Sequence, residues 1–408
     1  MSGSVGSAGE RENMQYRDDH RSGNKLSILG LGCMRFPHGL NTRIDVSKAE
    51  KIICEAIASG VNYLDTAYVY GGSEEATGEI LHKHGLREKI YLATKLPHQK
   101  CKSYKDFDRI FNEQLERLKT DYIDYYLIHN LSDMEAWEDL LSIGIEKWLA
   151  EKKDMGQIHY VGFSFHGSQT AFLSLLDVYD WDFCQIQYNY MDESYQAGRT
   201  GLLAAHEKGM AVIVMEPLLG GRLATGLPKK VKQLFKEVDG TRSPAAWALS
   251  WLWDQPQVTV VLSGMSNLEQ LYDNVETASA AVPGMLTEQE STTLSAAVDV
   301  FRSAYKVSCT GCNYCMPCPS GVNIPGCFAS YNARVATGLV AGMTRYVTST
   351  GANRPGKGSG PGNCVKCGAC EKECPQHIAI MSELDTVKKV MEPFWFRFVI
   401  KIVQKFMS

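Results

Sequence analysis

The sequence predicts an α/β protein in two parts, a (β/α)8 barrel followed by a small cysteine-rich domain. Eight short apolar or β-branched runs alternate with helical patterns between positions 27 and 280, as in a parallel barrel. The chain has 408 residues, whereas one barrel occupies about 250. Nine of the thirteen cysteines lie between Cys309 and Cys374. The excess length and these clustered cysteines together predict the second domain.

The predicted strands and helices follow one another in a regular order. Each strand is a short buried run, and each helix shows apolar residues at helical spacing. The strands are predicted at 27–31, 61–64, 90–94, 122–128, 159–163, 183–187, 211–215 and 258–262. Helices are predicted at 47–59, from 73, and at 104–118, 134–152, 169–179, 202–208, 244–253 and 267–278. The alternative is an open doubly wound sheet, which requires Gly-x-Gly-x-x-Gly after its first strand. Gly30-Leu-Gly32-Cys-Met-Arg35 lacks the third glycine, so the closed barrel is favoured.

The composition excludes several classes of protein. The apolar content of 44% and the charged content of 22% are those of an ordinary soluble protein. The net charge of −4 gives no reason to expect a nucleic acid partner. The first residues lack the apolar core of a signal peptide, and no apolar run is long enough to span a bilayer. We therefore expect a cytoplasmic protein, in which clustered cysteines indicate metal rather than disulfides.

Four polar residues fall at the carboxyl ends of consecutive predicted strands. Asp65 ends the second strand, Tyr70 lies just beyond it, Lys95 ends the third strand and His129 ends the fourth. In a (β/α)8 barrel the catalytic residues gather at this rim. A lysine ammonium lowers the pKa of a neighbouring phenol, and a carboxylate holds that lysine charged. The four side chains could therefore deliver a proton to a carbonyl oxygen while a hydride reaches the carbon.

The motifs around these residues are Gly60-Val-Asn-Tyr-Leu-Asp65-Thr-Ala-x-x-Tyr70-Gly, Ala93-Thr-Lys95 and Asp124-Tyr-Tyr-Leu-Ile-His129. Over positions 26 to 280 the sequence resembles the aldo-keto reductase superfamily. The resemblance implies that Asp65, Tyr70, Lys95 and His129 form the family's catalytic tetrad. It also implies NAD(P)H-dependent carbonyl reduction, or the reverse alcohol oxidation, on a small-molecule substrate.

The same resemblance implies a set of nucleotide-binding residues. In Gly162-Phe-Ser164-Phe165, Ser164 matches the family motif and Phe165 replaces its asparagine. Gln185 matches the glutamine that binds the nicotinamide amide, and Met215 falls where many members stack an aromatic ring. The remaining positions are Pro217, Leu218, Gly220 and Arg222 for the pyrophosphate and Ser266, Gln270 and Asn274 for the adenosine phosphate. The stretch 262–274 contains no Lys or Arg, which leaves the choice between NAD and NADP open.

Two cysteine runs follow the barrel. The second, which consists of Cys364, Cys367, Cys370 and Cys374-Pro375, has the spacing of bacterial ferredoxins. The first, which consists of Cys309, Cys312, Cys315 and Cys318-Pro319, has a last gap that is one residue shorter. Zinc bound by four thiolates is the alternative reading. In two-cluster ferredoxins the fourth cysteine of each run binds the other cluster.

By resemblance to those ferredoxins, one [4Fe-4S] cluster is expected on Cys309, Cys312, Cys315 and Cys374. The second is expected on Cys364, Cys367, Cys370 and Cys318. Cys327 is left over and is interpreted as a small core residue.

Barrel and cluster module together resemble bacterial aldo-keto reductases with a C-terminal ferredoxin-like domain. We expect a disordered segment at 1–24, the barrel at 25–285, a linking helix at 286–305, the 2[4Fe-4S] domain at 306–385 and an amphipathic helix at 386–408. The clusters would pass single electrons to or from a ferredoxin or another redox protein, or they would serve a structural role. The alternative is an electron-transfer or redox-sensing protein with a non-catalytic barrel.

The last sixteen residues, 393–408, form an apolar tail. Read as a helix, it carries a basic stripe of Arg397, Lys401 and Lys405. Burial against the protein or a second subunit is the favoured interpretation. Contact with a membrane surface or with a partner protein is the alternative.

Overall fold

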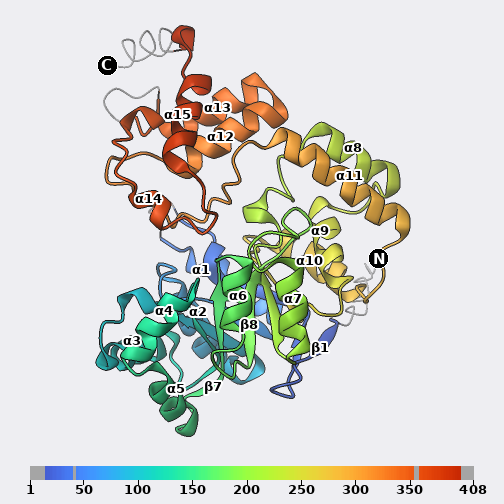
Figure 1. The fold of residues 1–408 in the computed structure, drawn as a ribbon. Helices are drawn as coiled ribbons and strands as arrows, with labels where there is room; N and C mark the ends of the chain where they lie inside the picture. Colours follow the sequence, from blue (N-terminus) through green and yellow to red (C-terminus); the bar gives the residue numbers. More distant parts are fainter. Residues whose placement is uncertain (1–13, 40–42, 353–357, 397–408) are drawn as a thin grey trace, which may run out of the picture. The chain divides into compact units, whose positions relative to one another are not determined.

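The computed structural model describes residues 14–39, 43–352 and 358–396. It divides into two compact units, shown in Figure 1. The barrel unit contains Met1–Pro217 and Ala245–Leu286, and the cysteine unit contains Leu218–Pro244 and Thr287–Ser408. The chain therefore enters the cysteine unit twice.

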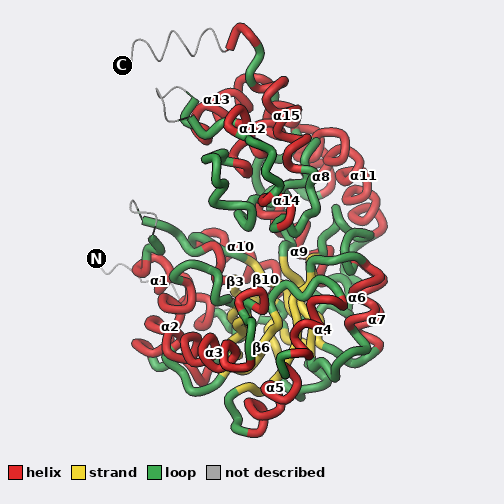
Figure 2. Tube along the Cα trace, turned by 60° about the vertical axis from the view of Figure 1, so that its left-hand side comes forward, coloured by secondary structure: helices red, strands yellow, loops and turns green. Residues whose placement is uncertain are grey.

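Eight parallel strands close the barrel, which confirms the predicted fold class. Their order around the barrel is β10-β3-β4-β5-β6-β7-β8-β9, and Figure 2 shows them in yellow among the red helices. The closure pairs the last strand with the first, because Ser263 lies opposite Leu31. The strands are β3 (Leu29–Gly32), β4 (Tyr63–Asp65), β5 (Tyr91–Leu96), β6 (Ile123–Ile128), β7 (Ile158–Phe165), β8 (Phe183–Gln187), β9 (Ala211–Met215) and β10 (Val260–Ser263).

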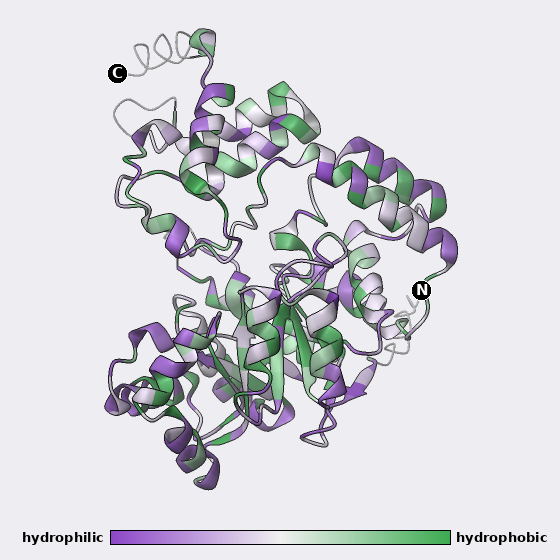
Figure 3. Cartoon of the chain, viewed as in Figure 1, coloured by the Kyte–Doolittle hydropathy of each residue, from purple (hydrophilic) through white to green (hydrophobic). Residues whose placement is uncertain are grey.

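The strands are apolar because helices cover their outer faces and side chains fill the interior. Every residue of β6 and β8 is buried, as expected for parallel strands covered on both sides. Much of the barrel's strand region appears green, that is hydrophobic, in Figure 3. The helices of this unit are α1 (Val46–Ala58), α2 (Ser73–His84), α3 (Tyr104–Leu118), α4 (Met134–Ser142), α5 (Ile145–Asp154), α6 (Gln169–Leu175), α7 (Gly198–Glu207), α9 (Pro244–Trp253) and α10 (Leu268–Ser279). Short 3-10 turns lie at η1 (Cys33–Arg35), η2 (Arg87–Lys89) and η3 (His98–Lys100).

The prediction of a single helix over 134–152 is wrong. The structure has two helices there, α4 and α5, separated by Gly144 at φ +90°. Glycine reaches this left-handed conformation without steric cost, so it interrupts an otherwise continuous helical pattern.

Residues 1–24 were predicted to be disordered. The structure describes the chain from residue 14, and from there on this prediction is wrong. An antiparallel hairpin of β1 (Tyr16–Asp18) and β2 (Lys25–Ser27) is formed there. The buried Asp19 accepts a hydrogen bond of 2.8 Å from the Tyr125 hydroxyl of β6, and Asn62, just before β4, bonds to the backbone of β2. These contacts lie at the amino ends of the barrel strands, so the hairpin covers the end opposite to the predicted site.

The cysteine unit is largely helical. Its elements are η4 (Leu219–Gly221), α8 (Lys229–Val238), α11 (Glu288–Ala304), α12 (Ile324–Thr337), α13 (Leu339–Thr350), η5 (Pro361–Asn363), α14 (Ala369–Lys372) and α15 (Ile380–Met391). Helices α8 and α11 pack side by side, as Figures 1 and 2 both show. A second apolar core forms around Val322, Phe328, Tyr346 and Leu384. Among the described residues, none of the helices is both long and apolar enough to cross a bilayer.

Some predicted domain boundaries move in the structure. The helix predicted at 286–305 is α11, but residues 218–244, which were assigned to the barrel, group with the cysteine unit. The reason is that Val231 and Phe235 of α8 are buried and pack with α11. Helix α15 begins at Ile380, before the predicted boundary at 386. The basic stripe of the tail lies outside the described residues.

Candidate active site and cysteine cavities

Asp65 and Lys95 form a buried ion pair at the carboxyl ends of neighbouring strands. The Lys95 Nζ lies 2.6 Å from Asp65 Oδ1 and donates a second hydrogen bond of 2.8 Å to the Thr66 carbonyl. The Lys95 side chain is 0% exposed. An ammonium is buried in this way only when it is paired and hydrogen-bonded, so Asp65 and Thr66 hold Lys95 in one position.

Tyr70 and His129 lie beside this pair. The Lys95 Nζ is 5.2 Å from the centroid of the Tyr70 ring, and the centroids of the Tyr70 and His129 rings are 6.0 Å apart, with the rings perpendicular. Tyr70 lies on the turn between β4 and α2, and the backbone N–H of His129 donates to the Leu96 carbonyl. The structure therefore brings together the four residues that the sequence placed on one rim.

Burial holds the pKa of His129 well below its ordinary value. The Lys95 ammonium, His166 and His98 add to this lowering because positive charges near an imidazole disfavour its protonation. His129 is therefore a neutral imidazole at physiological pH. A neutral imidazole still carries one N–H, so it can donate a hydrogen bond to an oxygen.

Two of the predicted nicotinamide residues take part in the network around the ion pair. The Gln185 amide donates to Asp65 Oδ2 at 2.8 Å, and a primary amide carries a second hydrogen and a carbonyl oxygen for a ligand. The Ser164 hydroxyl accepts a hydrogen bond from the Asn130 N–H at 2.8 Å, and Asn130 directly follows His129. Met215 ends β9 and is half-buried. Gln185 and Ser164 thus connect the predicted cofactor site to the backbone and side chains of the tetrad.

The predicted pyrophosphate loop has an unusual backbone. After Leu218, three consecutive residues adopt positive φ, with Leu219 at +45°, Gly220 at +65° and Gly221 at +93°. The N–H groups of Gly221 and Arg222 turn back onto the carbonyls of Leu218 and Leu219. These two N–H groups are thus used inside the turn, so the loop is held in place by its own hydrogen bonds. Pro217 is the last residue of the barrel unit before this loop.

The predicted adenosine-phosphate residues lie on and near α10. The Ser266 N–H and hydroxyl both donate to Gln270 Oε1, at 2.8 and 3.1 Å. Asn274 is buried and donates to the Ser263 hydroxyl at 2.8 Å. Asn274 therefore fixes the end of β10 against α10, while Ser266 and Gln270 form a polar pair at its start.

Each of two cavities is lined by three cysteines of one run and the last cysteine of the other run. The first cysteine cavity is lined by Cys309, Cys312, Cys315 and Cys374, which combines three residues of the first run with the last of the second. Apolar side chains, among them Phe328 and Ile380, complete its wall. These are the four residues that the ferredoxin resemblance assigned to one cluster.

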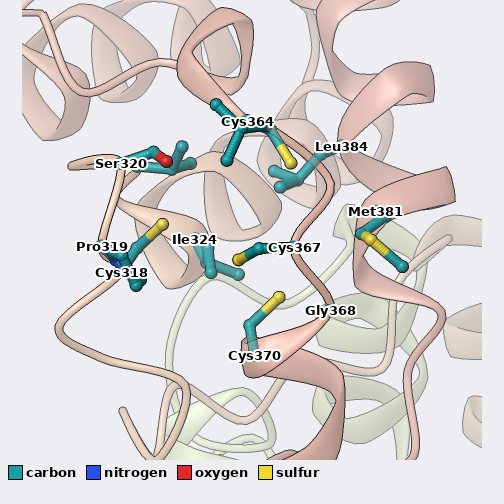
Figure 4. Close-up of a pocket in the computed structure, with 12 residues that line it drawn as sticks. Cys318, Pro319, Ser320, Ile324, Cys364, Cys367, Gly368, Cys370, Met381 and Leu384 are labelled. Atoms are coloured by element: carbon teal, nitrogen blue, oxygen red, sulfur yellow. The ribbon is translucent and has the colours of Figure 1, made fainter.

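The second cysteine cavity is lined by Cys318, Cys364, Cys367 and Cys370, together with Ile324, Met381 and Leu384. Figure 4 shows the four cysteine sulfur atoms turned toward a common space. Four thiols around an apolar cavity suit an iron–sulfur cluster, whose ligands are thiolates and whose potential depends on the exclusion of solvent. The leftover Cys327 is 0% exposed and belongs to the apolar core beside the cavities.

Comparison with known proteins assigns the barrel to a family. The aldo/keto reductase family model matches residues 28–294. The chain belongs to the aldo/keto reductase family. A 4Fe-4S dicluster domain model matches residues 308–379, which contain both cysteine runs. The protein is thus an aldo-keto reductase with a C-terminal 4Fe-4S dicluster domain.

The relatives of this aldo-keto reductase match its barrel. The uncharacterized oxidoreductase YqkF of Bacillus subtilis is 29% identical over 65% of this chain and 90% of its own length. An L-glyceraldehyde 3-phosphate reductase of Escherichia coli O157:H7 is 26% identical over 64% of this chain and 87% of its own. The solved structure of the aldo-keto reductase AKR11C1 from Bacillus halodurans, in its holo form, is 28% identical with a TM-score of 0.58, and it covers 70% of this chain and 96% of its own.

The structure of the reductase also reveals a cation that the sequence analysis missed. The stem of Arg35 lies against Gly264, since a Cβ built on that glycine would meet three Arg35 carbons at 3.3–3.5 Å. Gly264 belongs to the stretch 262–274, which contains no Lys or Arg of its own. The predicted closure of the barrel could have indicated this contact, because closure places the residues that follow the first strand beside those that follow the eighth.

Proposed function

We propose that this protein is an NAD(P)H-dependent reductase of small aldehydes or ketones, also able to run in the direction of alcohol oxidation. The observation that carries the proposal is the buried Lys95 ammonium, paired with Asp65 at 2.6 Å and 5.2 Å from the Tyr70 ring centroid. A fully buried charge beside a phenol is costly to maintain. A role of that phenol as the general acid for a carbonyl oxygen would explain why the charge is there.

Carbonyl reduction needs a hydride at carbon and a proton at oxygen. Bound NAD(P)H supplies the hydride. Tyr70 donates its hydroxyl proton to the carbonyl oxygen, and the Lys95 ammonium stabilises the phenolate that remains. Asp65 keeps Lys95 charged and in place, and neutral His129 donates a hydrogen bond to the same oxygen, which orients the substrate.

The residues around the predicted cofactor site favour NADPH over NADH in this proposal. The stem of Arg35 lies against Gly264, two residues before Ser266, whose hydroxyl donates to Gln270. Hydrogen bonds between a guanidinium and a phosphate are stronger than those between neutral groups. A 2′-phosphate would therefore be held by Arg35 together with the Ser266–Gln270 pair, and Gln185 would hold the nicotinamide amide.

The two cysteine cavities would each hold one [4Fe-4S] cluster. Each cluster passes one electron at a time, whereas a hydride carries two together, so no direct transfer between the nicotinamide and the clusters is proposed. A ferredoxin or another small redox protein is the proposed partner for the single electrons of the clusters. Protein purified without oxygen should then contain about eight irons per chain, whereas stoichiometric zinc and no colour would contradict the cluster assignment.

The substitution Tyr70→Phe tests the catalytic proposal. It removes the proton donor and keeps the ring, so carbonyl reduction should fall by about 10²- to 10⁴-fold, the usual contribution of general acid catalysis. The affinity for NADPH should change little, because the substitution removes one hydroxyl and leaves the predicted nucleotide contacts Ser164 and Gln185 in place. Turnover at the wild-type rate would refute the role of Tyr70. Absence of turnover in the wild type, with any carbonyl and with clusters loaded, would favour a non-catalytic barrel in an electron-transfer protein.

A further inference from the structure

Glu74 is a buried carboxyl group that the proposed mechanism does not use. It is the second residue of α2 and is 1% exposed. Its Oε1 accepts hydrogen bonds from the Thr94 hydroxyl at 2.6 Å and from the Gln114 amide at 2.9 Å. Its Oε2 lies 3.1 Å from Arg117 Nη1. Burial raises the pKa of Glu74, and these three donors oppose that rise. A buried carboxylate is costly unless it is paired and hydrogen-bonded, so these neighbours hold Glu74 in one place.

Two of the same neighbours fix the strand that carries Lys95. Thr94 directly precedes Lys95 on β5, and consecutive side chains of a strand point to opposite faces. The Gln114 amide donates to the Thr94 hydroxyl and to the Lys95 carbonyl, both at 3.1 Å. The Tyr126 hydroxyl donates to Gln114 Oε1 at 2.7 Å, which sets the direction of the amide. Strand β5 is therefore held on one face at the point where the Lys95 side chain leaves on the other.

The start of α2 also holds the loop that carries Tyr70. Ser73 directly precedes Glu74, and its backbone N–H donates to the Tyr70 carbonyl at 2.8 Å. The hydroxyl groups of Ser73 and Thr66 share a hydrogen bond of 2.8 Å. The Thr66 carbonyl in turn accepts from the Lys95 ammonium. The first turn of α2 thus contacts both the Tyr70 loop and the backbone that binds Lys95.

Arg117 holds the other side of the Tyr70 loop. Its guanidinium carbon lies 4.2 Å from the centroid of the Tyr68 ring. The Tyr68 hydroxyl donates to Glu113 Oε2 at 2.6 Å, and Glu113 lies one turn before Arg117 on α3. Tyr70 therefore lies between two positions, Tyr68 and Glu74, that contact the same arginine.

We propose that Glu74 is a positioning residue for the tetrad, because it joins the strand of Lys95 to the loop of Tyr70 and so fixes the spacing of the two side chains. This inference rests on the proposed function, in which Tyr70 gives a proton and Lys95 stabilises the phenolate. Glu74 acts on them only through Thr94, Gln114 and Arg117. Displacement of a reacting group by about 1 Å can cost about 10²-fold in rate, so the loss of Glu74 should slow the chemical step.

The experiment measures a single turnover of bound NADPH. Full-length, cluster-loaded protein with NADPH bound is mixed without oxygen with excess 4-nitrobenzaldehyde, and the loss of NADPH fluorescence is followed by stopped flow. In Glu74→Ala we expect a rate constant about 10- to 100-fold below that of the wild type and an unchanged Kd for NADPH. The rate constant reports only on molecules that are folded and hold NADPH. A loss of stability alone would lower the amplitude and leave the rate constant as it is.

The neighbouring glutamate provides a matched control. Glu75 also pairs with Arg117, at 3.4 Å, but its side chain is 53% exposed, so Glu75→Ala should keep the rate constant of the wild type. Glu74→Gln retains an oxygen that can accept from Thr94 and Gln114, so it should recover most of the rate that Glu74→Ala loses. If Glu74→Ala does not fold, Thr94→Val replaces it as the test. That change removes only the hydroxyl between Glu74 and β5, and it should also lower the rate constant.

The contrary results separate the inference from the proposed function. A rate constant equal to that of the wild type in Glu74→Ala, or in Thr94→Val, would overturn the positioning role. An equal loss in Glu75→Ala, or no recovery in Glu74→Gln, would also overturn it, because the effect would then not come from the buried hydrogen bonds. If the wild type oxidises no NADPH with a panel of aldehydes and ketones, the proposed function itself is wrong.

Discussion

The substitution Asp65→Asn tests how strongly the tetrad depends on its buried ion pair. The Lys95 ammonium is 0% exposed, and its partners are Asp65 Oδ1 at 2.6 Å and the Thr66 carbonyl at 2.8 Å. Removing one member of a buried pair costs about 3–5 kcal/mol, because the other charge stays buried without its partner. The side-chain oxygen of asparagine can still accept a hydrogen bond from Lys95, which recovers about 1 kcal/mol of the unfolding free energy. We therefore expect a loss of about 3 kcal/mol in the unfolding free energy of the barrel.

Urea unfolding followed by tryptophan fluorescence measures this loss. Of the seven tryptophans, only Trp395 lies outside the barrel unit, so the signal reports on the barrel. The control is the double variant Asp65→Asn/Lys95→Met, which removes both charges and should be more stable than Asp65→Asn alone. A loss below about 1 kcal/mol for Asp65→Asn, or a double variant less stable than the single one, would refute the reasoning.

Three further predictions concern other parts of the protein. Burial lowers the pKa of His129, so below about pH 6.5 the unfolded state binds a proton that the folded state excludes. The contribution of His129 to stability is therefore complete above that pH. As the pH falls further, the free energy of unfolding decreases by about 1.36 kcal/mol per pH unit. His129→Gln should flatten the urea stability profile between pH 7 and 5.5, and an unchanged slope would contradict the buried neutral imidazole. Arg35→Gln should weaken NADPH binding about tenfold or more and leave NADH binding unchanged, since a charged hydrogen bond contributes about 1.5–3 kcal/mol; equal losses for both dinucleotides would argue against 2′-phosphate recognition. Cys327→Ala should keep the iron content of the wild type, whereas Cys318→Ala should lower it, and the reverse result would reassign the ligands.

The eight strands and the meeting of the four rim residues could be predicted because their signals are local. Each strand is a short apolar run, and Asp65, Lys95 and His129 lie directly at or after such runs. The exchange of Cys318 and Cys374 between the cavities was also expected, but from resemblance to ferredoxins rather than from the spacing alone. In the structure each of the two cavities is indeed lined by cysteines of both runs.

The features that escaped prediction depend on contacts between distant positions. The hairpin of Tyr16–Asp18 and Lys25–Ser27 has a polar, charged sequence, and its order comes from bonds to Tyr125 and Asn62. Arg35 reaches Gly264 only because the barrel closes. The pairing of α8 with α11 joins segments about fifty residues apart. No pattern within a single window of sequence reports on such contacts.

The double entry of the chain into the cysteine unit limits how the protein can be divided. Residues 218–244 leave the barrel unit after Pro217 and return to it at Ala245, so no single cut separates the two units. A fragment ending at Leu286 would keep α8 without α11 and expose Val231 and Phe235 to water. A cut after Ala304 would instead keep α8 and α11 together with the barrel, and it lies just beyond residues 28–294, which the family model matches. The reductase part should therefore be separated from the cysteine-rich part only behind α11, where both helices of the pair stay on the same fragment.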